Sequence, residues 1–154
     1  MNRVAAVLSP ERIRLGFSAV NKSQVLDEAS RLLASFEGLE PNHITASLTA
    51  RERLGSTGLG AGVAIPHARL QGLRQAIAAF IRLSFAVAFD SPDGKPVTEV
   101  LVLLVPEQAT EEHLELLAQA AEMFNDRRFR DQLHKQTDVV DVYQAFVDWP
   151  MIAQ

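Results

Sequence analysis

The sequence predicts a mixed α/β fold, in which helices pack on a mixed parallel and antiparallel β-sheet within a single domain over residues 1–154. Three observations lead to this prediction. Some short segments alternate apolar and polar residues, as half-buried strands do, while others repeat apolar residues at helical spacing. The chain is 47% hydrophobic and 22% charged, which is the composition of one domain with a substantial core.

The first two elements follow from their periodicity. Ile13, Leu15 and Phe17 alternate with other residues and predict a short strand. From Lys22 the period changes to that of one helix face, and Gly38 closes this helix. Its apolar positions are Val25, Leu26, Ala29, Leu32, Leu33 and Phe36.

A second helix begins near Pro41, because proline is favoured in the first turn of a helix. Ile44, Leu48 and Leu54 continue along it, and it runs into Gly55. A glycine-rich segment therefore starts where a helix ends.

The middle of the chain has the composition of a sheet. Residues 63–65 predict a short strand and residues 76–83 a longer one. The stretch 90–96 is dense in turn residues and joins 87–89 to the β-prone segment 97–105. A β-hairpin is the simplest interpretation.

Three helical segments complete the chain. Thr110 is a candidate cap for the first of them, and the acidic pair at 111–112 suits a helix N-terminus. A short piece over 128–133 and a last helix over 138–149, capped by Thr137, follow. The expected buried face of the first of these helices consists of Leu114, Leu117, Ala118, Ala121 and Phe124.

Composition excludes several classes of partner. The net charge is -4 with a pI near 5.5, and the basic residues are scattered, so no nucleic-acid partner is expected. The apolar region 76–89 is interrupted by Arg82 and Ser84, and the N-terminal apolar stretch is too short for a signal. We therefore expect no membrane insertion and a cytoplasmic location.

No cofactor is expected either. The glycines of 58–62 lack the spacing of a dinucleotide fingerprint, and no Lys followed by Ser or Thr closes a phosphate loop. There is no cysteine, and the four histidines show no paired ligand spacing, so no metal site is predicted. These histidines are His43, His67, His113 and His134.

The stretch GSTGLGAGVAIPH (55–67) is the most informative in the chain. Glycines let a ligand approach main-chain N–H groups, whereas Pro66 fixes one dihedral and extends Ile65. His67 is thereby presented at a defined point. A neutral imidazole is a competent nitrogen nucleophile, which is what a phosphoryl acceptor needs. A turn histidine with a structural hydrogen bond is the alternative.

Three runs resemble a known family: RERLGSTGLGAGVAIPH (51–67), FDSPDGKPV (89–97) and LLVPEQATEEHL (103–114). They are similar to the enzyme IIA domains of the bacterial phosphoenolpyruvate-dependent phosphotransferase system, in the fructose/mannitol/nitrogen class. The opening of the first run and the Asp-Ser-Pro-Asp-Gly turn most resemble the nitrogen-regulatory members. Ala68 departs from that pattern, because those members usually have glycine after the histidine.

The resemblance implies roles for individual residues. His67 corresponds to the phosphoryl-carrying histidine, His113 to the second active-site histidine and Arg51 to the arginine near it. Ser56 and Thr57 are interpreted either as phosphate-binding hydroxyls or as residues that only cap and turn the chain.

The resemblance also implies a phosphotransferase that works by a phosphohistidine relay. The donor would be an HPr-like phosphocarrier protein, and the phosphorylation state would regulate nitrogen, potassium or carbon metabolism. Regulatory targets such as sensor kinases or potassium transport components would be its partners. Two alternatives remain: a subunit that passes phosphate to a fructose/mannitol-type sugar permease, and an interaction module that is never phosphorylated.

Overall fold

The computed structural model describes residues 1–35, 38–108 and 110–150. Within these ranges the strands form one sheet with helices on both faces, which confirms the predicted fold class. None of the helices described there is long and apolar enough to cross a membrane. The helices are α1 (Arg3–Val7), a short 3-10 helix (Pro10–Arg12), α2 (Lys22–Ala34), α3 (Pro41–Leu54), α4 (Glu111–Asn125), α5 (Arg127–Lys135) and α6 (Val139–Asp148). The strands are β1 (Ile13–Phe17), β2 (Gly58–Gly60), β3 (Val63–Ala64), β4 (His67–Leu70), β5 (Ile77–Val87) and β6 (Val97–Pro106).

The strand order is β1-β5-β6-β3-β2, and β4 pairs with β6 beyond β3. Strands β5 and β6 are antiparallel, with a register that runs from Ile77 opposite Leu104 to Val87 opposite Val97. This pair is the predicted hairpin. The pairings of β1 with β5, and of β3 and β4 with β6, are parallel, so the sheet is mixed.

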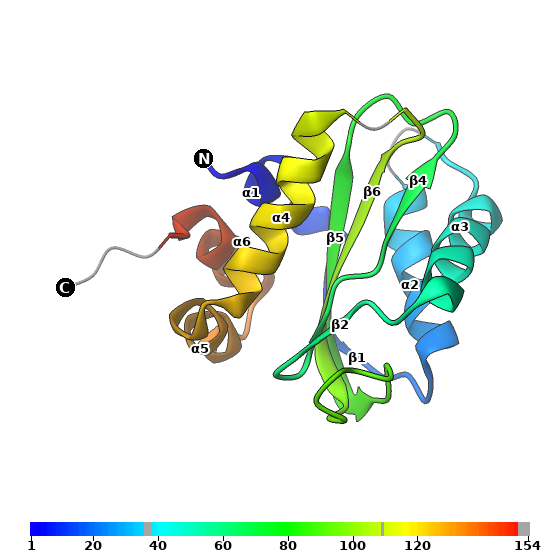
Figure 1. Cartoon of the computed structure of the whole chain (residues 1–154). Helices are drawn as coiled ribbons and strands as arrows, with labels where there is room; N and C mark the ends of the chain where they lie inside the picture. Colours follow the sequence, from blue (N-terminus) through cyan, green and yellow to red (C-terminus); the bar gives the residue numbers. More distant parts are fainter. Residues whose placement is uncertain (36–37, 109, 151–154) are drawn as a thin grey trace.

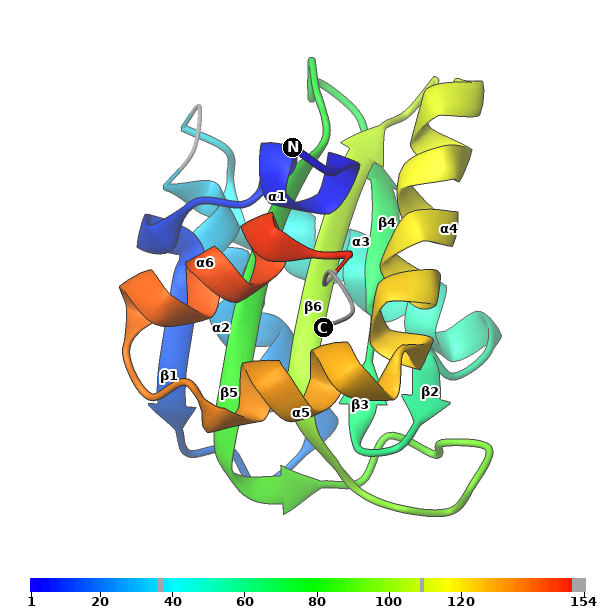
Figure 2. The same cartoon turned by 90° about the vertical axis from the view of Figure 1, so that its left-hand side faces the viewer.

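Two helical layers cover the sheet. Helices α1, α4, α5 and α6 lie on one face, and α2 and α3 lie on the other (Figures 1 and 2). Strand β6 shows why both layers form: Leu101 and Leu103 pack into the first core, and Val100 and Val102 pack into the second. A strand buried on both faces is almost continuously apolar, as this one is.

The edge of the sheet beyond β6 is interrupted at Pro66. Strands β3 and β4 lie one after the other along β6, and between them the Pro66 carbonyl accepts a hydrogen bond from the Leu103 N–H at 3.0 Å. The N–H of Ile65 does not pair with β6, because it donates to the Thr57 carbonyl at 3.0 Å. Pro66 has no N–H to donate. His67 therefore starts a new strand segment at a fixed point of the edge.

The buried face of α4 is rotated relative to the prediction. Leu114 is 59% exposed and Leu117 is only partly buried, although the helical period predicts both in the core. Apolar residues cover a wide arc of this helix, and packing against α1 and the sheet decides which part of the arc is buried. The buried residues are Leu116, Ala120, Met123 and Phe124.

Other differences are local. The sequence pattern does not predict helix α1 or strands β2 and β4. The N-cap of α6 is Asp138, whose side chain accepts from the Asp141 N–H, and not Thr137. Phe36, predicted on the apolar face of α2, lies outside the described residues.

Candidate functional site

A cavity of about 600 Å³ opens at the edge of the sheet, where α3, β4 and α4 meet. His67 at the start of β4, His113 in the first turn of α4 and Arg51 in the last turn of α3 all line it. The structure thus brings together three predicted site residues from separate elements. Their side chains are partly exposed, so the cavity is open to a partner.

The His67 ring has a defined tautomer. Its Nδ1 lies 2.9 Å from the Ile65 carbonyl oxygen. A carbonyl oxygen only accepts hydrogen bonds, so Nδ1 must carry the proton. In the neutral ring, Nε2 then has a free lone pair. The Ile65 carbonyl, just before Pro66, thus leaves Nε2 of the neutral ring able to act as a nucleophile.

The His113 ring has the opposite tautomer. Its Nδ1 accepts a hydrogen bond from the Thr110 N–H at 3.0 Å, which pairs an amide at the start of α4. Because a backbone N–H only donates, Nδ1 holds the lone pair and Nε2 carries the proton of the neutral ring. The two histidines therefore offer the cavity one acceptor and one donor.

Arg51 and Arg69 supply positive charge. Arg51 Nη1 donates to the Gly55 carbonyl at 2.9 Å, which holds the guanidinium at the end of α3. A guanidinium has five N–H groups, so this bond leaves others for an anion. Arg69 lines the same cavity, although the sequence motifs do not single it out. It lies two residues after His67 in β4, and the period of a strand would have placed both on one face.

Leucines form an apolar rim around this charged site. Leu54 is 85% exposed, and it lines the cavity together with Leu114 and Leu117. Exposed apolar side chains that gather at one place typically mark a surface for a protein partner. The helical period of α4 does not predict this apolar surface, because it assigns Leu114 and Leu117 to the core.

Ser56 and Thr57 do not line the cavity. The Ser56 hydroxyl donates to the Phe89 carbonyl and accepts from the Gly58 N–H at 3.0 Å. Thr57 is buried, and its hydroxyl and N–H donate to the two carboxylate oxygens of Glu52, at 2.6 and 3.0 Å. In this structure the two hydroxyls stabilise the glycine-rich loop through these hydrogen bonds.

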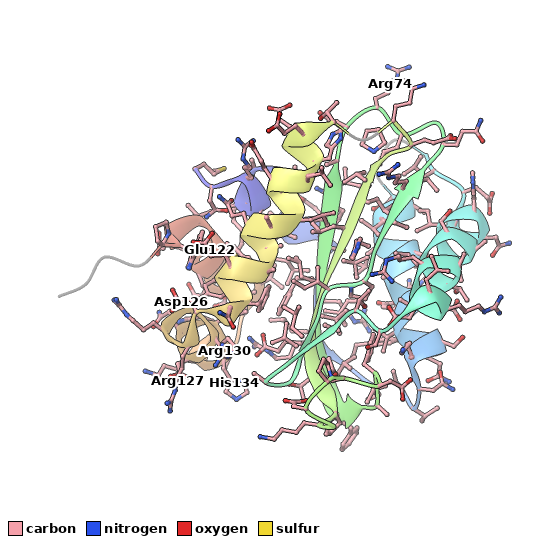
Figure 3. The ribbon with its side chains drawn as sticks, in the orientation of Figure 1. Arg74, Glu122, Asp126, Arg127, Arg130 and His134 are labelled. Carbon is pink, nitrogen blue, oxygen red and sulfur yellow. The ribbon has the colours of Figure 1, made fainter. Side chains whose placement is uncertain are left out.

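A second cavity, of about 450 Å³, lies between α5 and the turn that joins β2 to β3. Figure 3 shows two of its lining residues, Arg130 and His134, at the end of the molecule opposite Arg74. Burial raises the pKa of Glu99, which also lines this cavity, and Arg82 and His134 partly oppose that shift.

Nowhere in residues 1–35, 38–108 and 110–150 do three His, Cys, Asp or Glu side chains group so as to hold a metal ion. The first cavity remains the candidate site.

Comparisons with known proteins identify the family of this chain. Residues 6–148 match the family described as phosphoenolpyruvate-dependent sugar phosphotransferase system, EIIA 2. The nitrogen regulatory protein of Pseudomonas aeruginosa is 43% identical over 149 residues, which are 96% of this chain and 97% of that protein.

Solved structures give the same result. The crystal structure of nitrogen regulatory protein IIA-Ntr from Neisseria meningitidis superposes with a TM-score of 0.88 at 42% identity, covering 94% of this chain and 99% of that one. IIA mannitol from Escherichia coli, at 21% identity and a TM-score of 0.74, shares the fold over 89% of this chain and 96% of its own. This chain therefore belongs to the EIIA 2 family of the phosphoenolpyruvate-dependent sugar phosphotransferase system.

Proposed function

We propose that Nε2 of His67 accepts a phosphoryl group from the phosphohistidine of an HPr-like carrier protein, and that the two phosphorylation states bind regulatory partners differently. One observation carries this proposal: the hydrogen bond from Nδ1 to the Ile65 carbonyl, which in the neutral ring leaves the lone pair on Nε2. The membership of the chain in a family of phosphotransfer components supports it.

The chemistry needs a nucleophile and positioned donors. The lone pair of His67 Nε2 forms the new N–P bond, the N–P bond of the carrier breaks, and its electron pair returns to the carrier ring. Charge on the transferring group is spread over its three equatorial oxygens. The Nε2–H of His113 and the guanidinium of Arg51 line the same cavity and would donate to these oxygens.

The leucine rim explains how two proteins would bring their histidines together. Phosphoryl transfer between two rings requires close docking, and water must be excluded from the labile N–P bond. Leu54 and Leu114 are exposed beside the cavity and would be covered by the carrier. The same rim would be available to a regulatory target, whose binding would then respond to a phosphate on His67.

A regulatory role is favoured over delivery of phosphate to a sugar permease. Its support is similarity, because the chain is 43% and 42% identical to the nitrogen regulatory proteins of Pseudomonas aeruginosa and Neisseria meningitidis and 21% identical to IIA mannitol of Escherichia coli. Nitrogen, potassium or carbon metabolism is the proposed field of regulation. Sensor kinases or potassium transport components are the classes of target to test.

The test is intact-mass analysis after incubation with phosphoenolpyruvate, enzyme I and an HPr-like carrier. We expect one acid-labile phosphate on the wild type, none on His67→Ala and one on His134→Ala, a control that changes an exposed histidine outside the cavity. An unmodified wild type beside a phosphorylated carrier would refute the relay and favour a pure interaction module. A phosphate retained by His67→Ala would move the acceptor to another residue.

A further inference from the structure

We propose that Glu52 is a positioning residue for His67: its carboxylate anchors the glycine-rich loop through Thr57 and so sets the orientation and tautomer of the His67 ring. The consequence for phosphoryl transfer rests on the function proposed above. The positioning itself is a property of the unphosphorylated protein and can be measured without any phosphate donor.

Glu52 is a buried carboxylate with its acceptors in use. Its residue is 8% exposed, and it lies in the last turn of α3 beside Arg51. Oε2 accepts from Lys22 Nζ and from the Thr57 N–H, each at 3.0 Å, and Oε1 accepts from the Thr57 hydroxyl at 2.6 Å. Removing these acceptors would strand buried donors, which is strongly unfavourable. The carboxylate therefore fixes both the backbone and the side chain of Thr57.

Two further hydrogen bonds connect Thr57 to His67. The Thr57 carbonyl accepts from the Ile65 N–H at 3.0 Å, and the Ile65 carbonyl accepts from His67 Nδ1 at 2.9 Å. A continuous path thus runs from the Glu52 carboxylate through the backbones of Thr57 and Ile65 to the ring. The loop between them contains three glycines, which give little stiffness of their own. The hydrogen bonds from Glu52 to Thr57 and from Thr57 to Ile65 must therefore hold the loop rigid.

Another buried carboxylate provides a matched control. Glu28 on α2 is 3% exposed, and it pairs with Arg31 on the same helix and with Arg14 on β1. Both partners lie far along the chain from the glycine-rich loop, and Glu28 does not line the cavity of His67. Glu28→Ala removes a buried carboxylate elsewhere in the fold and should leave the His67 ring unchanged.

Glutamine at position 52 separates shape from charge. Its amide oxygen, placed where Oε2 lies, can accept from Lys22 and from the Thr57 N–H, and its amide nitrogen can donate to the Thr57 hydroxyl oxygen. The network would keep its geometry and lose its negative charge. A positioning role predicts that Glu52→Gln resembles the wild type and that Glu52→Ala does not.

The experiment measures the ring nitrogens by NMR on protein labelled with ¹⁵N-histidine, at about pH 9, where an ordinary histidine is neutral. We expect a single Nδ1–H tautomer of His67 in the wild type, Glu52→Gln and Glu28→Ala. Glu52→Ala should show averaged tautomers. Thr57→Val removes only the hydroxyl donor and should show partly averaged tautomers. This variant replaces Glu52→Ala in the test if Glu52→Ala does not fold.

A second readout is the rate of phosphorylation by the carrier. Loss of positioning should slow Glu52→Ala by roughly 10- to 100-fold, since small displacements of reacting groups have effects of that size. Glu52→Gln and Glu28→Ala should keep rates close to that of the wild type. Equal defects in Glu52→Ala and Glu28→Ala would reduce the effect to lost stability and overturn the positioning role.

The two proposals fail in different ways. A single Nδ1–H tautomer in Glu52→Ala overturns the positioning role, whether or not the protein is ever phosphorylated. A defect in Glu52→Gln as large as that in Glu52→Ala also overturns it, because charge would then be the cause. A wild type that takes no phosphate, together with the expected tautomer changes, refutes the relay and leaves the positioning intact.

Discussion

Gly58, in the segment that leads to His67, is packed so closely that even a methyl group should not fit. A Cβ added to Gly58 would overlap the Ser91 Oγ and would lie 3.0 Å from the Ser91 Cβ and 3.1 Å from the Ser91 Cα. Gly55, three residues earlier, has no heavy atom within 4 Å of such a Cβ and an extended backbone. We therefore expect Gly58→Ala to be destabilising and Gly55→Ala to be nearly neutral.

The size of the effect follows from these distances. Rotation of the Ser91 side chain relieves only the overlap with Oγ, and the Ser91 Cβ and Cα both remain closer than ordinary van der Waals distance. Ser91 is itself buried, so the backbone of the 90–96 turn must shift. Overpacking of this kind costs about 1 to 3 kcal/mol. For a chain of this length that is a fall in Tm of roughly 2 to 12 °C.

Thermal and urea unfolding of Gly58→Ala, Gly55→Ala and the double variant Gly58→Ala/Ser91→Gly would measure it. The double variant removes the Oγ and Cβ of Ser91, two of the three atoms that crowd the new methyl group, and should recover part of the lost stability. Equal melting temperatures for the two alanine variants, or no recovery in the double variant, would refute the packing argument.

The remaining predictions concern titration and packing. Burial raises the pKa of Glu99, so the stability that the protonated carboxyl contributes is fully present below its ordinary pKa and is lost as pH rises through the raised pKa. Above about pH 4.5, the free energy of unfolding should therefore fall less with pH in Glu99→Gln than in the wild type. Hydrogen bonds from backbone N–H groups, chiefly that of Ala61, lower the pKa of Asp93. The ionised carboxylate therefore stabilises the wild type until acid protonates it, and Asp93→Asn should lack this stabilisation at neutral pH. Leu116→Ala should lower the free energy of unfolding by about 2 to 5 kcal/mol, whereas Leu114→Ala should change it by less than about 0.5 kcal/mol, as chemical denaturation can check.

The sequence is sufficient to predict the elements that carry strong local signals. Pro41 begins α3 and Gly55 follows its last residue, as expected for a first-turn proline and a terminal glycine. Strand β4 escapes prediction because its four residues are too few to show a period, and pairing with β6 alone makes them a strand. The rotation of α4 could not be predicted, since Leu114 and Leu116 are equally apolar and only tertiary packing distinguishes them.

The candidate site shows the same division. Motifs are sufficient to select His67, His113 and Arg51, which meet in one cavity, although their roles stay predictions until tested. Ser56 and Thr57 could not be assigned from sequence, because a hydroxyl serves an anion or a turn equally well and the choice depends on partners distant in the chain.

The two nitrogens of His113 are divided between architecture and chemistry: one completes the helix start at Thr110, and the other is left for the cavity. His113→Ala would remove both nitrogens at once. A slower reaction in that variant would not distinguish the loss of a hydrogen-bond donor from fraying of the start of α4. Glutamine can cap a helix from this third position, so it is the more informative replacement. Few other side chains could accept the Thr110 N–H with one atom and present a donor to the cavity with another.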